Sequence, residues 1–164
     1  MSDEVFHRDA GVVASMNTPE FPPLDPAFAE RVRASFGRQT FMTLLGATLQ
    51  RVEPGKVDIS VMYRADLTQQ HGYLHAAVTT AIADSACGYA AMTLTPAGGD
   101  VLSVEFKTNL LRPAAGERFR AEGRVLKPGR TLTVARGDVF AETEGRSTLI
   151  ATMLATMIVQ AGAK

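Results

Sequence analysis

A polar loop that opens directly into a long apolar helix constrains the fold of this chain more than any other stretch. The loop occupies residues 69–75, and the helix is predicted over residues 76–92. At 1.5 Å per residue, a helix of this length is about 25 Å long. Its only charged residue is Asp84, near the middle. Burying a carboxylate is costly unless it is paired or has a chemical role, so Asp84 is the first candidate for chemistry.

The two sides of this predicted helix differ in the size of their residues. One side carries a bulky stripe that can fill the concave face of a sheet, formed by Val78, Ile82, Tyr89 and Met92. The other side carries small residues around the carboxylate, namely Ala77, Thr80, Ala81, Asp84, Gly88 and Ala91. Small residues let another backbone come close, and we expect that neighbour to be the same helix of a second subunit.

Extended segments surround this helix and predict an α+β fold. The expected strands cover residues 41–52, 56–63, 101–111, 117–126, 131–142 and 147–160. Turn residues separate neighbouring strands at 53–55, 127–130 and 144–146. The order of elements fits a long antiparallel sheet wrapped around one central helix.

A shorter helix is expected near the start of the chain. Asp25 would be its N-cap and Pro26 its first residue, and it would run to about Ser35 and end at Gly37. Before it, we expect residues 1–24 to form a loosely ordered leader, and 25–164 to form a single domain.

Composition narrows the partners and the compartment. Lys plus Arg and Asp plus Glu number 17 each with no basic run, which disfavours nucleic acid as a partner. The single cysteine excludes an internal disulfide framework and fits a reducing compartment. No apolar run suggests a signal peptide or a membrane span, so we expect a cytoplasmic protein that does not contact membranes.

The position of His75 relative to Asp84 bears on how a site could be assembled. The two residues are nine positions apart, about 13 Å along the helix axis and about half a turn out of phase. They are therefore not expected to serve the same atom within one chain, and two antiparallel copies would form a composite site at a dimer interface. The alternative is a structural carboxylate bonded to the hydroxyl of Thr80 or Ser85.

The spacing of Gln69, Gly72, His75 and Asp84 resembles that of a known family. It is similar to the pattern of hotdog-fold acyl-CoA thioesterases of the phenylacetyl-CoA and 4-hydroxybenzoyl-CoA (PaaI) type. Residues 102–106 (LSVEF), followed by LRPA at 111–114, also look like that family's strand after the helix. The resemblance covers about residues 40–160 and implies a hotdog fold.

The resemblance implies roles for five residues. Asp84 would be the general base for water or the nucleophile on the thioester carbonyl. The backbone N–H of Ala76, at the positive end of the helix, would stabilise the oxyanion. His75 would fix the loop or polarise the carbonyl, Gln69 of the opposite subunit would orient water or substrate, and Ser103 would assist.

The implied reaction is hydrolysis of a small or medium acyl-CoA by a homodimer or by a tetramer made from two dimers. It requires no metal or redox cofactor, because coenzyme A is part of the substrate. The family commonly has His-Gly-Gly where this chain has His75-Ala76-Ala77, and the added methyl groups leave the amide donor in place. Gly72 and Arg130 are the candidate substrate contacts, Arg130 because its turn could overhang a groove and meet the phosphates of coenzyme A.

Other reactive residues carry less weight. Cys87 has no cationic neighbour in sequence to favour a thiolate and is expected in the core. His71 is expected to be a solvated loop residue, and with His7 in the leader the three histidines lack metal-ligand spacing. Two other functional classes stay open, an acyl-CoA-sensing module and a hotdog hydratase or dehydratase. The acidic leader disfavours the first, and the missing His–Asp motif of hydratases disfavours the second.

Overall fold

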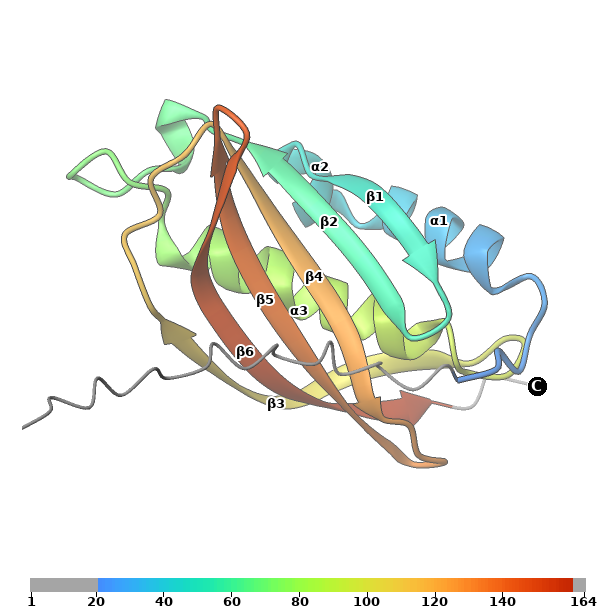
Figure 1. Ribbon diagram of the computed structural model, residues 1–164. Coiled ribbons are helices and arrows are strands. Elements are labelled where there is room, and N and C mark those ends of the chain that lie inside the picture. The colour runs from blue at the N-terminus through green and yellow to red at the C-terminus, as the bar shows by residue number, and fades with distance from the viewer. Residues whose placement is uncertain (1–20, 161–164) are drawn as a thin grey trace, which may run out of the picture.

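The computed structural model describes residues 21–160 of the chain (Figure 1). Its elements are α1 (Phe28–Arg38), α2 (Thr40–Leu45), β1 (Thr48–Glu53), β2 (Lys56–Met62), η1 (Ala65–Leu67), α3 (Ala76–Met92), β3 (Asp100–Leu110), β4 (Arg118–Lys127), β5 (Leu132–Thr143) and β6 (Arg146–Gln160). The predictions for residues 1–20 and 161–164, His7 among them, lie outside the described residues. Within residues 21–160, no helix is long and apolar enough to cross a membrane.

The six strands form one antiparallel sheet in the order β1-β2-β4-β5-β6-β3. The sheet curves around α3, which packs most closely on β4 and also contacts β2, β5 and β3 (Figure 1). This is the sheet wrapped around one helix that the order of elements predicts. Since β3 pairs only with β6, it is an edge strand whose outer hydrogen-bonding groups have no strand partner within residues 21–160.

Two glycines bring α3 directly onto the sheet. Gly123 of β4 and Gly137 of β5 are paired across their strands. A Cβ at Gly123 would overlap the carbonyl of Ala86, and one at Gly137 would lie 2.9 Å from the Cys87 Sγ. The helix backbone therefore lies directly against β4 at Gly123, and the small Cys87 side chain lies against β5 at Gly137, both within one turn of Asp84.

The two sides of α3 follow the predicted pattern. Its bulky stripe is buried, and Cys87 is fully buried beside it, as expected of a core cysteine. On the other side Ala77 is exposed, and Thr80, Ala81, Asp84 and Gly88 are partly exposed. Ala91 differs from the rest of this group because it is buried. The small-residue face is thus the part of α3 that its own sheet leaves uncovered.

The predicted strand over residues 41–52 is wrong in its first half. Residues Thr40–Leu45 form α2, which ends at Gly46 in the left-handed conformation with φ 67°. Its buried residues are Met42 and Leu45, whose three-residue spacing is typical of a helix. The apolar run as a whole is also compatible with a strand, so its pattern does not decide between the two. The strand itself, β1, begins only at Thr48.

The first helix also differs from its prediction at both ends. It begins at Phe28, because Asp25 caps a turn instead and accepts the N–H of Ala27 through Oδ1 at 2.9 Å. Asp25 is held there by an ion pair with Arg31, with 3.2 Å between the nearest atoms. Gly37 does not end the helix, which continues to Arg38. Glycine weakens a helix but can be accommodated near its end.

The face of the sheet turned away from α3 is polar. Ion pairs connect neighbouring strands at Arg51–Asp58, Asp58–Arg124 and Arg120–Glu142, and the pair Arg124–Glu122 lies within β4. Asp58 is only 6% exposed, and its ion pairs with Arg51 and Arg124 explain why a carboxylate can lie between Val57 and Ile59. With its charges paired to one another, this face can remain in contact with water.

Candidate active site

Asp84 and Ser103 form a direct contact between α3 and β3. The Ser103 hydroxyl donates to Asp84 Oδ1 at 2.6 Å, a length typical of a hydrogen bond to an ionised carboxylate. Ser103 pairs in register with the buried Met157, which puts its side chain on the α3 side of the sheet. The partner of the carboxylate is therefore Ser103, and neither Thr80 nor Ser85 takes that place.

The carboxylate stays accessible although it is bonded. Asp84 is partly exposed, and among residues 21–160 its second oxygen, Oδ2, receives no hydrogen bond. A hollow of about 320 Å³ opens beside it, between the end of α1, the middle of α3 and the start of β3. Because an ionised carboxylate only accepts hydrogen bonds, Oδ2 can take a proton from a water molecule that enters this hollow.

A second group of predicted residues gathers at the start of α3. His75 is its N-cap, and its Nδ1 accepts the N–H of Ala77 at 2.9 Å. The His75 carbonyl accepts from Val78 at 2.9 Å. Since Nδ1 is an acceptor, the ring proton is assigned to Nε2. His75 thus fixes the chain where the loop becomes a helix.

The amide of Ala76 differs from those that follow it. Within residues 21–160 its N–H has no acceptor, whereas the N–H groups of Ala77 and Val78 are both used. Free N–H groups at a helix start carry the positive end of the helix dipole and favour negative charge. Ala76 can therefore donate to an oxygen that becomes an anion during a reaction.

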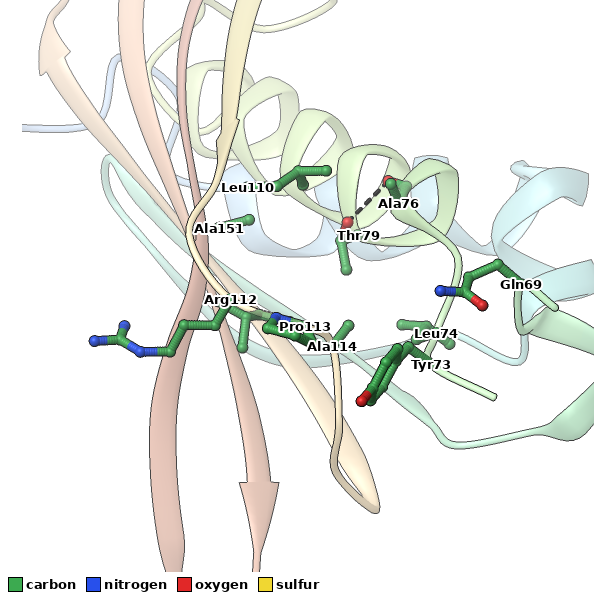
Figure 2. A pocket seen from close by; sticks show the side chains of 11 residues that line it. Gln69, Tyr73, Leu74, Ala76, Thr79, Leu110, Arg112, Pro113, Ala114 and Ala151 are labelled. Carbon is green, nitrogen blue, oxygen red and sulfur yellow. Dashed lines mark hydrogen bonds between the residues drawn. The ribbon is translucent and has the colours of Figure 1, made fainter. Parts of the chain in front are cut away.

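A hollow of about 330 Å³, of which Ala76 is a lining residue, lies beside the start of α3 (Figure 2). Gln69 and Tyr73 come from the loop before α3, Ala76 and Thr79 from its first turn, and Leu110 lies across from them at the end of β3. Most of the other lining residues are apolar, as in a pocket for an acyl group or the arm that carries it.

Arg112 and Gly72 border this region without pointing a functional group into it. The Arg112 guanidinium donates to the Leu149 carbonyl at 2.8 Å, and Figure 2 shows it directed away from the other labelled side chains. Gly72 is exposed with φ 80°, and its carbonyl accepts the Tyr63 hydroxyl at 3.1 Å. Gly72 makes the turn that a residue with a side chain would strain.

One chain does not bring the two groups together. Ala76 and Asp84 are eight residues apart on one straight helix, about 12 Å along its axis. Arg130 is more remote, since it is exposed in the β4–β5 turn beside a third hollow at the other end of α3, next to Leu94 and Pro96. Gln69 joins Ala76, Ser103 joins Asp84, and Arg130 joins neither group.

Two further candidates can be set aside. Burial raises the pKa of the Cys87 thiol far above its usual range, so this cysteine is not a nucleophile. His71 is exposed in the loop, as expected. Among residues 21–160, no three His, Cys, Asp or Glu side chains are grouped so that they could hold a metal ion.

Sequence reasoning missed Ser35 and Gln39, which line the hollow beside Asp84 together with Tyr89. Tyr89 was expected only as a core residue. Ser35 and Gln39 reach the hollow because α1 folds back toward α3, a contact between segments about 50 positions apart. Only the helical spacing of Ser35, Gln39 and the buried Met42 could have hinted that one face of this region meets the core.

Comparisons with known proteins show what this chain resembles in sequence and fold. The sequence profile described as the thioesterase superfamily matches residues 71–148, from the loop before α3 into β6. A curated relative from Saccharolobus solfataricus, named as an esterase, is 30% identical over 95 residues, which are 58% of this chain and 66% of that relative. The match thus spans just under two thirds of that relative's length.

Solved structures extend the similarity over most of the chain. A thioesterase family protein from Silicibacter pomeroyi is 49% identical with a TM-score of 0.81, and the match covers 82% of this chain and 99% of that chain. The PaaI protein from the phenylacetic acid degradation operon of E. coli has a TM-score of 0.75 at 18% identity, covering 85% of this chain and 98% of its own. At that identity the likeness concerns the fold.

Proposed function

Because this chain belongs to the thioesterase superfamily and has its hotdog fold, we propose that it hydrolyses a small or medium acyl-CoA to the free acid and coenzyme A. Thioester hydrolysis in general is the activity that the family supports. The acyl-CoA substrate, the residue roles and the paired assembly are our proposal. The observation that carries it is the accessible Asp84 carboxylate, held by Ser103 at 2.6 Å beside an open hollow.

In this mechanism Asp84 acts as a general base. Its Oδ2 takes a proton from water while the water oxygen bonds to the thioester carbonyl carbon. The carbonyl oxygen becomes an oxyanion and accepts the N–H of Ala76. When the carbonyl re-forms, the carbon–sulfur bond breaks, and the proton held by Asp84 passes to the departing sulfur. The other role considered for Asp84, attack on the carbonyl, would form an anhydride that water then opens.

A dimer is needed because the base and the oxyanion donor are about 12 Å apart within one chain. The uncovered face beside α3 supports this assembly. Phe106 pairs with the buried Ala155 and so lies on the α3 side of β3, yet it is 46% exposed. Leu110, on the same strand, is 59% exposed. A second copy could continue the sheet at this edge and cover both residues, with its α3 antiparallel to the first.

Such a pairing would bring Asp84 of one subunit to the Ala76 amide of the other. Gln69 would arrive with Ala76, as it lines the same hollow. The loop turn at Gly72 is the proposed contact for the rest of the coenzyme. Arg130, which lies at the other end of α3 within one chain, stays a predicted contact that depends on how the subunits pair. Association of two dimers into a tetramer and a cytoplasmic location stay predictions from the sequence.

Subunit mixing tests the composite site directly. Asp84→Asn removes the base, and Ala76→Pro removes the amide hydrogen at the first helical position, where proline is tolerated. His75 already has the extended backbone that suits a residue before proline, with φ −64° and ψ 139°. Each variant alone should release little thiol from acyl-CoA. In an equal mixture half of the dimers are hybrid with one intact site, so about a quarter of wild-type activity should return.

Three outcomes would contradict the proposal. Hybrid dimers that form, as confirmed by two affinity tags, but recover no activity would show that both groups act within one subunit. A wild-type protein that binds acyl-CoA but releases no thiol would favour the sensing module, and loss of enoyl absorbance without thiol release would favour a hydratase.

A further inference from the structure

The connection between α3 and β3 is held by one arginine of the first helix. Arg31 of α1 extends its guanidinium to residues 92–99, where α3 ends and the chain turns into β3. Its two terminal nitrogens donate to five oxygens there, the carbonyls of Met92, Thr95, Pro96 and Gly99 and the hydroxyl of Thr95. Its Nε is paired with the buried carboxylate of Asp25, 3.2 Å away. Hydrogen bonds from a charged donor are stronger than those between neutral groups, so Arg31 holds this connection firmly.

The contacts of Arg31 reach both ends of the connection. Met92 is the last residue of α3, and its carbonyl, which has no partner within the helix, accepts from Nη2 at 3.2 Å. The positive charge also suits the negative end of the α3 dipole. Gly99 directly precedes Asp100, the first residue of β3, and its carbonyl accepts from Nη1. The arginine thus ties the end of the helix to the start of the strand.

The same helix and strand meet again at Asp84 and Ser103. Asp84 lies eight positions before Met92, about 12 Å along α3, and Ser103 lies four positions after Gly99, about 13 Å along β3. The two elements therefore form sides of similar length, closed at one end by Arg31 and at the other by the 2.6 Å hydrogen bond. Since O–H···O hydrogen bonds weaken beyond about 3.0 Å, a small change of angle at the Arg31 end is enough to lose this bond.

Strand pairing constrains the start of β3 less than it constrains the middle of the sheet. β3 is an edge strand, so within the described part of the chain its first residues pair with β6 alone. Their partners Gln160 and Val159 are the last two residues of that strand. The ladder is also irregular between Ser103 and Glu105. The position of Ser103 therefore depends also on how the connection before it is held.

We propose that Arg31 is a positioning residue, which sets β3 against α3 so that the Ser103 hydroxyl reaches Asp84. The kinetic part of this inference rests on the proposed function, because a misplaced Ser103 slows hydrolysis only if Asp84 is the base. Arg31 lines neither of the hollows at the candidate site and acts through the backbone that it holds. Loss of its guanidinium should therefore slow the reaction and leave substrate binding almost unchanged.

A double-mutant cycle with Ser103 tests this role. Arg31→Met removes all five hydrogen bonds and should lower kcat for thiol release, per folded protein, about fivefold, with KM within about twofold of the wild type. In the Ser103→Ala background, where the hydroxyl to be placed is absent, the same substitution should cost less than about twofold. Arg33→Met, at an exposed arginine of the same helix, is the matched control and should leave kcat unchanged in both backgrounds.

Hydrogen exchange gives a measurement that does not depend on activity. In Arg31→Met the amides of residues 100–104 should exchange at least about tenfold faster than in the wild type, whereas those of β4 should keep the wild-type rate. Unchanged exchange over residues 100–104 would show that Arg31 does not hold the start of β3, and the inference would be wrong.

The outcomes separate this inference from the function on which its kinetic part rests. If Arg31→Met slows thiol release by the same factor with and without the Ser103 hydroxyl, its effect is a general one on the structure, and the inference is wrong while the proposed function stands. If the wild type releases no thiol, the proposed function falls and hydrogen exchange decides the inference by itself. If Arg31→Met yields no folded protein, Arg31→Lys, which keeps the charge and three donors, takes its place, and its cost should likewise shrink in the Ser103→Ala background.

Discussion

The two halves of the candidate site use different kinds of groups, side chains around Asp84 and the backbone around Ala76. Around Asp84 the functional atoms belong to side chains, one in the middle of α3 and one near the start of β3, and the helix packs on the sheet at Gly123 and Gly137. Around Ala76 they belong to a backbone amide and to a loop that the N-cap His75 fixes in place. The comparison teaches that the proton-transfer half depends on helix–sheet packing, whereas the oxyanion half depends on loop conformation.

The largest effect should come from the side-chain half. Asp84→Asn keeps an oxygen that can accept the Ser103 hydroxyl but removes the base, so turnover should fall about a hundredfold or more. Thiol release from acyl-CoA is the measurement. Asp66→Asn, at an exposed aspartate of η1, should leave the rate unchanged. A folded Asp84→Asn protein with wild-type turnover would remove Asp84 from the mechanism.

Separating the subunits should disable both halves at once. Phe106→Glu places a charge on the α3 side of the edge strand, where the second copy is proposed to sit, and should yield monomers with at least about tenfold lower activity. Lys107→Glu changes the charge on the neighbouring position of the same strand, on the outer face, and should remain dimeric. Size exclusion with light scattering measures the mass. A monomeric wild type of full activity would contradict the composite site.

Ser103→Ala should act only on the half that contains Asp84. It removes the 2.6 Å hydrogen bond that orients the carboxylate, and we expect turnover to fall about tenfold. Ser103→Thr keeps a hydroxyl and should recover part of that loss. Equal rates for the alanine variant and the wild type would mean that the orientation of Asp84 is set by packing alone.

The smallest effect is expected at His75, whose side chain caps the helix start in the half of the site that contains Ala76. His75→Ala removes the acceptor of the Ala77 N–H and should lower the free energy of unfolding by about 1 kcal/mol. His75→Asn restores a capping oxygen and should recover most of that stability. Urea titrations followed by circular dichroism give both values. If asparagine restores the stability but not the turnover, His75 has a further role at the substrate.

The sequence predicted the elements whose pattern is local and strong. Residues 76–92 are helical with the bounds predicted, and the turn Glu144-Gly145 joins β5 and β6 as expected, with both residues at positive φ. The run before Thr48 failed because its apolar residues fit both a helix and a strand, so only packing against the core decides. Helix geometry also predicted that His75 and Asp84 would lie apart.

Contacts between distant segments were beyond the reach of such patterns. Ser103 was singled out only through the family resemblance, since an alternating polar face on an edge strand gives no reason to choose one hydroxyl over the next. The pairing of Ser103 with Asp84 depends on the register of β3 against β6, including an irregularity between Ser103 and Glu105. Gln39 was missed for the same reason, because its neighbour Tyr89 is 50 positions away in sequence.

The direct seating of α3 on Gly123 and Gly137 has a consequence for how this protein can diversify. At Gly123 the helix backbone lies directly on the sheet backbone, so even one added methyl group there would displace the helix. Single substitutions at the contact between α3 and the sheet are therefore not expected to enlarge the hollow beside Asp84. Its other wall, from Ser35 to Gln39, lies on a separate helix that can change its side chains while the carboxylate stays where it is. That wall is therefore a part of the hollow where substitutions can change the substrate without moving Asp84.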